Sequence, residues 1–262
     1  MENSVNQQAR HIVITGASAG IGRALALLLA KDGVTLGLIA RNAEQLNEVA
    51  SQCRKLGAMV ELAQINVNDA QALINWVKKF DDVHPIDWFI ANAGMTASIG
   101  VNHDLEPLYE ALEVLDTNLI GVIHSVYAVL PLMCKRGHGQ IGLVSSLAAW
   151  RGMALTPTYS ASKAGVKAYG ESLRDLVAPK GVGVSVIFPG FVETAMSDQF
   201  PGSRPNMISA TQAAEKIISG MKANSAYIAF PWHFAFGLRI LGVLPFQVGS
   251  FFLRLLSLQP KN

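Results

Sequence analysis

Apolar runs alternate with stretches of helical periodicity along this chain, and turn residues separate them. The runs HIVIT (11–15) and VTLGLIA (34–40) are typical of buried strands, and a helix is predicted between them over about 21–31. A more polar helix is predicted to start at Asn42 and to stop at Gly57. Strands that alternate with helices in this way indicate βαβ units, so we expect an α/β fold with a parallel sheet.

The same alternation continues toward the C-terminus. Four further apolar runs are predicted as strands: MVELAQI (59–65), IDWFIA (86–91), QIGLVS (140–145) and VGVSVIF (182–188). The helices between them are predicted near 69–80, 104–135 and 157–178. A last helix begins near Ser209, where Ser209 and Gln212 match a capping box, and a short strand AYIAF (226–230) follows. The strands carry few charges, as expected where helices cover both faces of a sheet, and no repeat or linker interrupts the series, so we predict one domain over 1–262.

Composition argues against several classes of protein. The chain has 262 residues, of which 50% are hydrophobic and 15% charged, enough for one large buried core. A net charge of +2 without a long basic run argues against a nucleic-acid partner. Cys53 and Cys134 lie far apart and no histidines have metal-ligand spacing, so we expect neither disulfides nor a metal site. The N-terminal stretch is polar and lacks the layout of a secretory signal, so we expect a cytoplasmic protein.

A glycine cluster, TGASAGIG (15–22), follows the first predicted strand. Gly16, Gly20 and Gly22 remove the Cβ atoms that would keep the backbone away from a ligand. The helix that starts here also offers free N–H groups and its positive end to a pyrophosphate. A tight turn with a purely structural role is the alternative interpretation. The position after the first strand of a βαβ unit favours a dinucleotide site.

Tyr159 and Lys163, in the stretch YSASKAG (159–165), are four residues apart in a predicted helix. This spacing places both side chains on one face, and the small residues around them leave room for a ligand. A solvated surface pair is the alternative interpretation. A lysine ammonium close to the phenol should lower the pKa of Tyr159 below its usual value of about 10, which would suit it to acid–base catalysis near neutral pH.

Six short motifs occur in the order and at the separations of one enzyme family. They are TGASAGIG (15–22), ANAG (91–94), Asn118, Ser146, YSASK (159–163) and PGFVET (189–194). On these motifs, from about residue 10 to residue 230, the chain resembles the short-chain dehydrogenase/reductase family. The resemblance implies a Rossmann-type doubly wound parallel sheet in a single domain. It also implies a bound NAD or NADP and hydride transfer between the nicotinamide and a carbonyl or alcohol carbon.

The resemblance assigns four catalytic residues. Tyr159 would be the acid/base, Lys163 would assist it and hold the ribose hydroxyls of the cofactor, and Ser146 would hydrogen-bond the substrate oxygen. Ser145 competes for this last role, but the separation of thirteen residues between Ser146 and Tyr159 is the one that matches the family. Asn118 matches the asparagine that supports a water relay to the lysine.

Cofactor contacts are expected from the residues that match the binding motifs of the family. They are Gly16, Ser18, Gly20, Ile21, Gly22, Arg41, Asn66, Val67, Asn92, Ala93, Gly94, Tyr159, Lys163, Pro189, Gly190, Val192 and Thr194. NADP is favoured over NAD, because Ala40 stands where an NAD-selective acid would lie and Arg41 follows with a guanidinium suited to a 2′-phosphate. Ala19 occupies the place of a second basic residue that many NADP-preferring relatives carry, so the preference depends on Arg41. Asn66 replaces an aspartate that commonly binds adenine, so we expect weaker discrimination of that base.

The substrate site is expected to be apolar. Five large side chains flank the catalytic motifs: Met95, Trp150, Met153, Phe191 and Met196. Packing in the core is an equally good account of each of them. The stretch 191–208 is rich in Gly, Pro and Ser, which is typical of a lid that closes over a substrate. We therefore expect a lipophilic small molecule, such as a fatty-acyl, steroid-like or polyketide-like carbonyl or alcohol.

The C-terminal segment, about 231–258, is more apolar than a closing strand requires. Fourteen uncharged residues separate Arg239 from Arg254, interrupted by Pro245, which is short of the roughly 18–20 residues that span a bilayer. One interpretation is a cover over the substrate site or a subunit interface, since the resemblance also implies a homodimer or homotetramer. The other is a segment that lies on a membrane surface, with Arg239, Arg254 and Lys261 near the headgroups, in a protein peripheral to the membrane.

Taken together, the motifs predict an NADP-dependent carbonyl reductase or alcohol dehydrogenase. The alternative from another class is a nucleotide-binding regulatory or scaffold protein that keeps the fold and has lost the chemistry. The complete set of Ser146, Tyr159 and Lys163 argues against this alternative.

Overall fold

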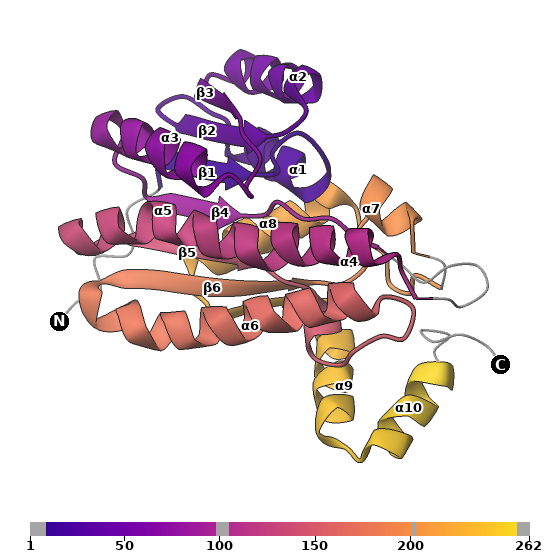
Figure 1. The fold of residues 1–262 in the computed structure, drawn as a ribbon. Coiled ribbons are helices and arrows are strands. Elements are labelled where there is room, and N and C mark those ends of the chain that lie inside the picture. Colours follow the sequence, from indigo (N-terminus) through magenta and orange to yellow (C-terminus); the bar gives the residue numbers. More distant parts are fainter. Residues whose placement is uncertain (1–8, 98–104, 201–202, 256–262) are drawn as a thin grey trace.

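The sheet of this protein has seven parallel strands in the order β3-β2-β1-β4-β5-β6-β7 (Figure 1). The computed structural model describes residues 9–97, 105–200 and 203–255. The strands are β1 (His11–Thr15), β2 (Thr35–Ala40), β3 (Met59–Gln64), β4 (Trp88–Ala91), β5 (Gly139–Val144), β6 (Val182–Pro189) and β7 (Tyr227–Phe230). The strand order reverses between β1 and β4, and open α/β sheets bind their ligands at such a point, outside the carboxyl ends of the strands.

Helices cover both faces of this sheet (Figure 1). On one face lie α1 (Gly20–Leu29), α2 (Ala43–Lys55) and α8 (Ala210–Lys222), and on the other α3 (Ala70–Val83), α5 (Gly121–Arg136) and α6 (Pro157–Val177). The remaining α-helices in the described part of the chain are α4 (Leu108–Leu115), α7 (Ala195–Asp198), α9 (Trp232–Val243) and α10 (Phe246–Leu255). This arrangement confirms the predicted α/β fold with a Rossmann-type doubly wound sheet.

Two predicted helix starts are confirmed by their caps. The side chain of Asn42 accepts a hydrogen bond from the N–H of Gln45 at 3.0 Å, directly ahead of α2. Ser209 and Gln212 make both bonds of the capping box at the start of α8, each 3.1 Å long. Such caps satisfy N–H groups that a helix leaves without an internal partner, so local sequence fixes these boundaries.

Two elements differ from the sequence prediction. The helix predicted over 104–135 is interrupted, because a short π-helical segment, Asp116–Ile120, separates α4 from α5, and residue 104 lies outside the described residues. Strand β3 stands at the edge of the sheet, and Met59 and Glu61 are exposed there. Helices therefore do not cover this strand on both faces. Its side chains alternate between more exposed and more buried positions, whereas those of β2 are all buried.

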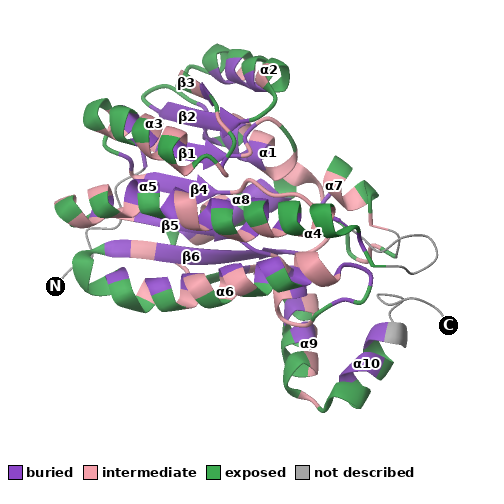
Figure 2. Ribbon diagram, viewed as in Figure 1, coloured by how far each residue is buried: buried purple, intermediate pink, exposed green. Residues whose placement is uncertain are grey.

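Helices α9 and α10 form a C-terminal hairpin beyond the last strand, and Figure 1 shows it projecting from the body of the domain. It corresponds to the predicted extension over 231–258, of which 256–258 lie outside the described residues. The inner side of the hairpin joins a third apolar cluster that includes Phe188, Leu238 and Leu253. Exposed residues occur on both of its helices (Figure 2).

One stretch of the described chain, Leu108–Arg136, is by length and composition alone apolar enough to cross a membrane. It comprises α4, the π-helical segment and α5, and 50% of its most apolar part is buried inside the domain. Core helices of doubly wound sheets pass the same test. The finding is therefore weak evidence for a membrane span.

Candidate active site

The glycine loop that follows β1 makes a narrow turn into the start of α1. Gly16 and Gly20 have φ angles of +66° and +50°, in the left-handed region that favours glycine. A Cβ atom on Gly16 would lie 2.8 Å from the Cα of Ala93, and one on Gly22 would lie 2.2 Å from the carbonyl oxygen of Gly16. The loop therefore keeps this shape only with glycine at these positions.

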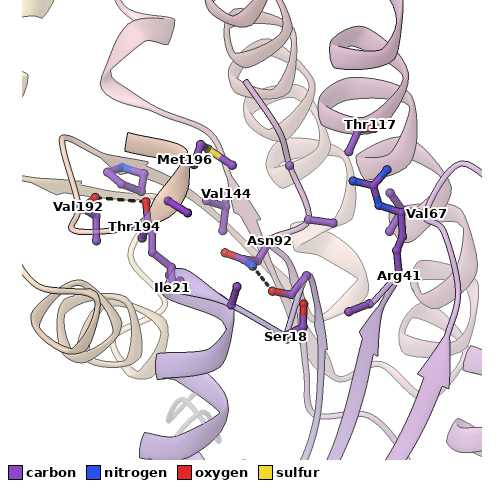
Figure 3. Close-up of a pocket in the computed structure, with 18 of the residues that line it drawn as sticks. Ser18, Ile21, Arg41, Val67, Asn92, Thr117, Val144, Val192, Thr194 and Met196 are labelled. Atoms are coloured by element: carbon purple, nitrogen blue, oxygen red, sulfur yellow. Dashed lines mark hydrogen bonds between the residues drawn. The ribbon is translucent and has the colours of Figure 1, made fainter. Parts of the chain in front are cut away.

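The ANAG turn after β4 holds the glycine loop in place. The hydroxyl of Thr15 accepts hydrogen bonds from the backbone N–H groups of Asn92 and Ala93, both at 3.0 Å. The amide nitrogen of Asn92 donates to the carbonyl oxygens of Thr15 and Gly16, at 3.0 and 3.2 Å, and Figure 3 draws one of these bonds. These bonds fix the two turns relative to one another and preorganise the site between them.

A cavity of about 400 Å³ opens beside these turns, at the carboxyl ends of the strands. Its walls include every predicted cofactor residue except Gly22: Gly16, Ser18, Gly20, Ile21, Arg41, Asn66, Val67, Asn92, Ala93, Gly94, Tyr159, Lys163, Pro189, Gly190, Val192 and Thr194. Gly22 lies behind the loop, where its lack of a Cβ lets α1 approach. The volume is usual for a ligand site, and the glycine turn with the first turn of α1 suits a pyrophosphate, so a dinucleotide fits this cavity.

Tyr159 and Lys163 lie one turn apart on α6 and meet in the wall of this cavity. The ammonium nitrogen of Lys163 is 5.7 Å from the centre of the Tyr159 ring and donates a 3.0 Å hydrogen bond to the carbonyl oxygen of Val144. Lys163 is buried, and Tyr159 is packed among apolar residues. The pair therefore belongs to a ligand site and is not the solvated surface pair considered as the alternative.

Two neighbouring serines at the end of β5 have different surroundings. The hydroxyl of Ser145 is buried and donates to the backbone carbonyl of Lys163 at 2.8 Å, so it fastens α6 to the sheet. The hydroxyl of Ser146 accepts from the N–H of Ala148 at 3.2 Å and hydrogen-bonds the Tyr159 phenol. Ser146 is thus the serine placed beside the phenol, in agreement with its spacing in the sequence.

The ionisation of this pair differs from the sequence prediction. Burial raises the pKa of Tyr159, and the hydrogen bond from Ser146 opposes this effect only in part. Burial also lowers the pKa of Lys163 from 10.5 to about 8. The pKa of Tyr159 therefore lies above its usual value, opposite to the direction predicted from the sequence. Desolvation dominates here, because both groups are removed from water and the ammonium is held by the carbonyl of Val144.

Asn118 lies in the π-helical segment and is fully buried. Its side chain accepts from the N–H of Met95 at 2.8 Å, donates to the carbonyl oxygen of the same residue at 2.9 Å, and donates to the hydroxyl of Ser162 at 3.1 Å. A Cβ on Gly94 would lie 3.1 Å from the Asn118 amide oxygen and 3.5 Å from the Lys163 nitrogen. The amide thus ties the ANAG turn to α6, close to Lys163 and outside both cavity walls.

A second, smaller cavity of about 80 Å³ continues from the first past Tyr159. Its walls are mainly apolar: Thr96, Ser146, Leu147, Ala148, Met153, Thr156, Tyr159, Gly190, Phe191, Met196, Ser197, Phe200 and Phe234. Tyr159, Gly190, Met196 and Ser197 belong to both cavities. The phenol therefore stands at the junction between a dinucleotide cradle and an apolar pocket.

Three of the five predicted pocket residues line this second cavity, and two do not. Met153, Phe191 and Met196 are in its walls. Met95 faces Asn118 through its backbone, and Trp150 lies outside both walls. The Trp150 ring packs at 4.9 Å from the ring of Phe188, which makes it part of the third apolar cluster.

Sequence reasoning missed several residues of the site, among them Thr117, Phe200 and Phe234. Thr117 is buried in the wall of the cofactor cavity, and its hydroxyl has no hydrogen-bond partner among the described residues (Figure 3). Its position next to Asn118 was the available signal. Phe200 and Phe234 line the apolar pocket. Phe234 comes from α9, and no local pattern links it to residues of the catalytic motifs that precede it by more than seventy positions.

The residues expected to select the cofactor lie at the end of β2. Arg41 lines the cofactor cavity, and its guanidinium extends toward Thr117 and Val67 in Figure 3. One of its nitrogens is 3.6 Å from a carboxylate oxygen of Glu113 on α4, and both side chains are largely exposed. The amide oxygen of Asn66 already accepts from the N–H of Asn68 at 3.1 Å. Among the described residues, no cluster of three His, Cys, Asp or Glu side chains is arranged to hold a metal ion.

Comparisons with known proteins agree with this geometry. Residues 10–204 match the family model described as short chain dehydrogenase. An uncharacterized oxidoreductase of Myxococcus xanthus is 35% identical over 239 residues, covering 90% of this chain and 93% of the relative. The 11-beta-hydroxysteroid dehydrogenase-like protein 4A of Arabidopsis thaliana is 30% identical, covering 84% of this chain and 76% of the relative.

Solved structures extend the agreement to the fold. A short chain dehydrogenase/reductase from Burkholderia phymatum, in complex with NAD, matches with a TM-score of 0.80 at 22% identity, over 89% of this chain and 93% of the other. This likeness concerns the arrangement of the sheet and helices. The assignment to a family rests on the family model and on the Myxococcus relative. The chain therefore belongs to the short-chain dehydrogenase/reductase family of oxidoreductases, which bind a nicotinamide cofactor.

Proposed function

We propose that this protein is an NADP(H)-dependent carbonyl reductase or alcohol dehydrogenase that acts on a lipophilic ketone, aldehyde or secondary alcohol. One observation carries the proposal: the Tyr159 phenol lies where the dinucleotide cavity meets the apolar pocket, next to Ser146 and Lys163. A phenol in this position reaches an oxygen held in the pocket and faces the cofactor side at the same time.

The chemistry divides between the cofactor and the chain. A bound nicotinamide supplies or accepts the hydride. In reduction, Tyr159 donates its proton to the carbonyl oxygen, and the Ser146 hydroxyl donates a hydrogen bond to the same oxygen as negative charge develops. Lys163, buried beside the phenol, stabilises the phenolate that forms. We assign Asn118 the support of a water relay that returns a proton to Lys163.

NADP preference rests on Arg41. Its guanidinium borders the cavity where β2 ends, Ala40 puts no carboxylate there, and a planar guanidinium binds a 2′-phosphate through two parallel hydrogen bonds. Glu113 competes with the phosphate for this guanidinium. The Burkholderia neighbour was solved with NAD, but at 22% identity that ligand does not transfer to this chain.

A lipophilic substrate is supported by the pocket walls. Met153, Phe191, Phe200 and Phe234 leave few polar partners for a substrate other than the catalytic groups. Phe191, Met196 and Phe200 come from the segment 191–208, of which residues 201 and 202 lie outside the described part of the chain. We propose this segment as the lid over the substrate. The name of the Arabidopsis relative, a hydroxysteroid dehydrogenase-like protein, is consistent with a bulky apolar alcohol.

We assign the protein to the cytoplasm, where a nicotinamide oxidoreductase with two free cysteines fits a reducing compartment. A homodimer or homotetramer is also proposed. It is supported by exposed apolar side chains on helices of one face of the sheet, among them Tyr109 and Leu112 of α4, Tyr127 of α5 and Leu176 of α6. Single exposed apolar residues are ordinary, but a group of them on adjoining helices indicates an interface.

The test is turnover of NADPH with a panel of apolar ketones and aldehydes, followed by NADPH absorbance. We expect turnover with bulky apolar carbonyls and a loss of about 100-fold or more in Tyr159→Phe, with NADPH binding retained. Tyr169→Phe, on the same helix and away from both cavities, is the matched control and should keep full activity. Tight NADPH binding without turnover across the panel would instead support the scaffold alternative, which the complete catalytic set disfavours.

A further inference from the structure

The C-terminal hairpin has an apolar face that no described part of the chain covers. On α9, Trp232, Phe236, Ile240 and Val243 are spaced by four, four and three residues, so they lie on one side of the helix. Their exposed fractions run from 43% to 85%. On α10, Phe246, Val248, Phe251 and Phe252 are also exposed. We call the four exposed α9 side chains the hairpin face.

The opposite side of α9 is apolar as well, but it is used inside the protein. Ala235 and Leu238 are buried, and Phe234 and Leu241 pack against the third apolar cluster. A helix that is apolar all round is normally enclosed by protein or by lipid. Since the body of the domain encloses only one side of α9, the other side needs a partner from outside the described chain.

The hairpin is tied to the body of the domain through Arg239. The Arg239 guanidinium lies 4.5 Å from the centre of the Trp150 ring and 5.6 Å from that of Tyr227. The Tyr227 hydroxyl hydrogen-bonds the carboxylate of Glu171 on α6. Burial and this carboxylate together raise the pKa of Tyr227 to about 12, so the anchor stays intact at ordinary pH.

Charge favours an anionic lipid surface as the partner. After Glu215 the sequence contains no Asp or Glu, while it contains Lys216, Lys222, Arg239, Arg254 and Lys261. A second copy would present the same basic segment, since this stretch of the sequence supplies no carboxylate of its own. An anionic surface with an apolar interior complements both the charge and the exposed aromatic rings. Neither helix of the hairpin is long enough to span, so the segment would lie in the interface.

The hairpin is also continuous with the apolar pocket. Phe234 points its side chain into the pocket wall from the first turn of α9, two residues after Trp232 on the hairpin face. We propose that the hairpin face docks onto a lipid surface containing anionic headgroups, with the pocket beside it, so that a lipid-dissolved substrate enters without crossing bulk water. The second part of this proposal rests on the proposed function, whereas docking itself does not.

Vesicle flotation of the full-length protein tests the docking. With phosphatidylglycerol-containing vesicles we expect flotation, and we expect about a tenfold or greater loss of the bound fraction when Trp232, Phe236, Ile240 and Val243 are all replaced by Gln. The control variant carries Met59→Gln and Val83→Gln, two exposed apolar side chains far from the hairpin, and should float like the parent. Light scattering and NADPH turnover of a water-miscible ketone are measured on all three proteins.

The outcomes separate docking from catalysis. No flotation of the parent, or equal flotation of the hairpin variant, would overturn the proposal even if the enzyme turns over soluble ketones. The proposal would also be overturned if neither protein bound vesicles and light scattering gave the hairpin variant half the mass of the parent. The hairpin face would then be the contact with a second copy. Vesicle binding that is lost only in the hairpin variant supports docking, and it does so even if no carbonyl is reduced, in which case the proposed function fails by itself.

Discussion

The dinucleotide cradle and the C-terminal hairpin occupy opposite parts of the chain and are held by opposite means. In the cradle, Thr15 and Asn92 fix two backbone turns through hydrogen bonds of 3.0 to 3.2 Å. In the hairpin, Arg239 is stacked on the rings of Trp150 and Tyr227. The cradle therefore depends on backbone positions that tolerate few residue types, whereas the hairpin depends on side-chain surfaces that many residues can provide.

The largest expected effect contrasts two helical glycines. A Cβ on Gly22 would meet the Gly16 carbonyl oxygen at 2.2 Å, whereas a Cβ on Gly237 of α9 would have no described atom within 4 Å. Gly22→Ala should thus distort the glycine loop and weaken NADPH binding by about 100-fold, the equivalent of about 3 kcal/mol. Titration of NADPH against each protein by calorimetry measures this.

The matched change in the hairpin, Gly237→Ala, should stabilise the protein. Gly237→Ala adds a better helix former at an open position and should raise the free energy of unfolding by about 0.5–1 kcal/mol without changing NADPH affinity. Denaturant unfolding measures the first quantity. If both variants bound NADPH like the parent, the glycine loop would not need its present shape, and the comparison between the two regions would fail.

The next effect concerns the buried cation of the cradle. Because burial lowers the pKa of Lys163 from 10.5 to about 8, the folded protein binds fewer protons than the unfolded chain between these values. The free energy of unfolding should therefore rise with pH across this window, and the buried charge lowers stability most below pH 8. Lys163→Met should be more stable than the parent by about 2 kcal/mol at pH 7, with the difference shrinking toward pH 10.

Urea unfolding of both proteins at several pH values checks this, and the variant should also lose activity. The hairpin provides a direct comparison. The Arg239 guanidinium is exposed and lies over the Trp150 ring, so its removal should not raise the free energy of unfolding in the same way. A stability difference between Lys163→Met and the parent that is the same at every pH would contradict the assigned cause.

The contrast between the two regions also explains what the sequence could predict. The glycine loop and the caps at Asn42 and Ser209 depend on residues close in sequence, so their patterns predicted both structure and position. The ANAG turn was recognised from its short motif, although its bonds to Thr15 and Gly16 span 76 to 78 residues. The placement of Ser146, and not Ser145, beside the Tyr159 phenol agrees with the separation of thirteen residues on which the resemblance to the family rests.

Features set by contacts between distant residues were not predictable in this way. The π-helical segment carries no proline or glycine within it, and it accompanies the bonds from Asn118 to Met95 and Ser162, which are 23 and 44 residues away. Trp150 is predicted as a pocket residue because it flanks the catalytic motifs, but its partners Tyr227 and Arg239 come from β7 and α9. The depressed pKa of Lys163 likewise comes from burial by several elements together.

A smaller effect is expected at the rim of the cradle. Arg41→Ala should weaken NADPH binding by about tenfold and leave NADH binding nearly unchanged, because only the 2′-phosphate distinguishes the two ligands. Glu113→Gln removes the carboxylate 3.6 Å from this guanidinium and should strengthen NADPH binding slightly. Steady-state KM values for both cofactors measure the two changes. Equal losses for NADPH and NADH in Arg41→Ala would show that Arg41 does not read the phosphate.

The smallest expected effect is at the hairpin anchor, where Arg239→Ala removes the guanidinium that lies over the Trp150 and Tyr227 rings. Such contacts contribute about 0.5–1 kcal/mol at exposed sites, so the free energy of unfolding should fall by about that amount, while NADPH affinity stays unchanged. Because α9 also carries Phe234, a looser anchor should raise the KM of a bulky apolar carbonyl more than that of a small one. The control is Lys55→Ala on the exposed side of α2, which removes the same charge without a ring contact. If Arg239→Ala changed NADPH affinity or lowered kcat for all substrates equally, the hairpin would be coupled to the cradle, and the two regions would not be the separately held units that their contacts indicate.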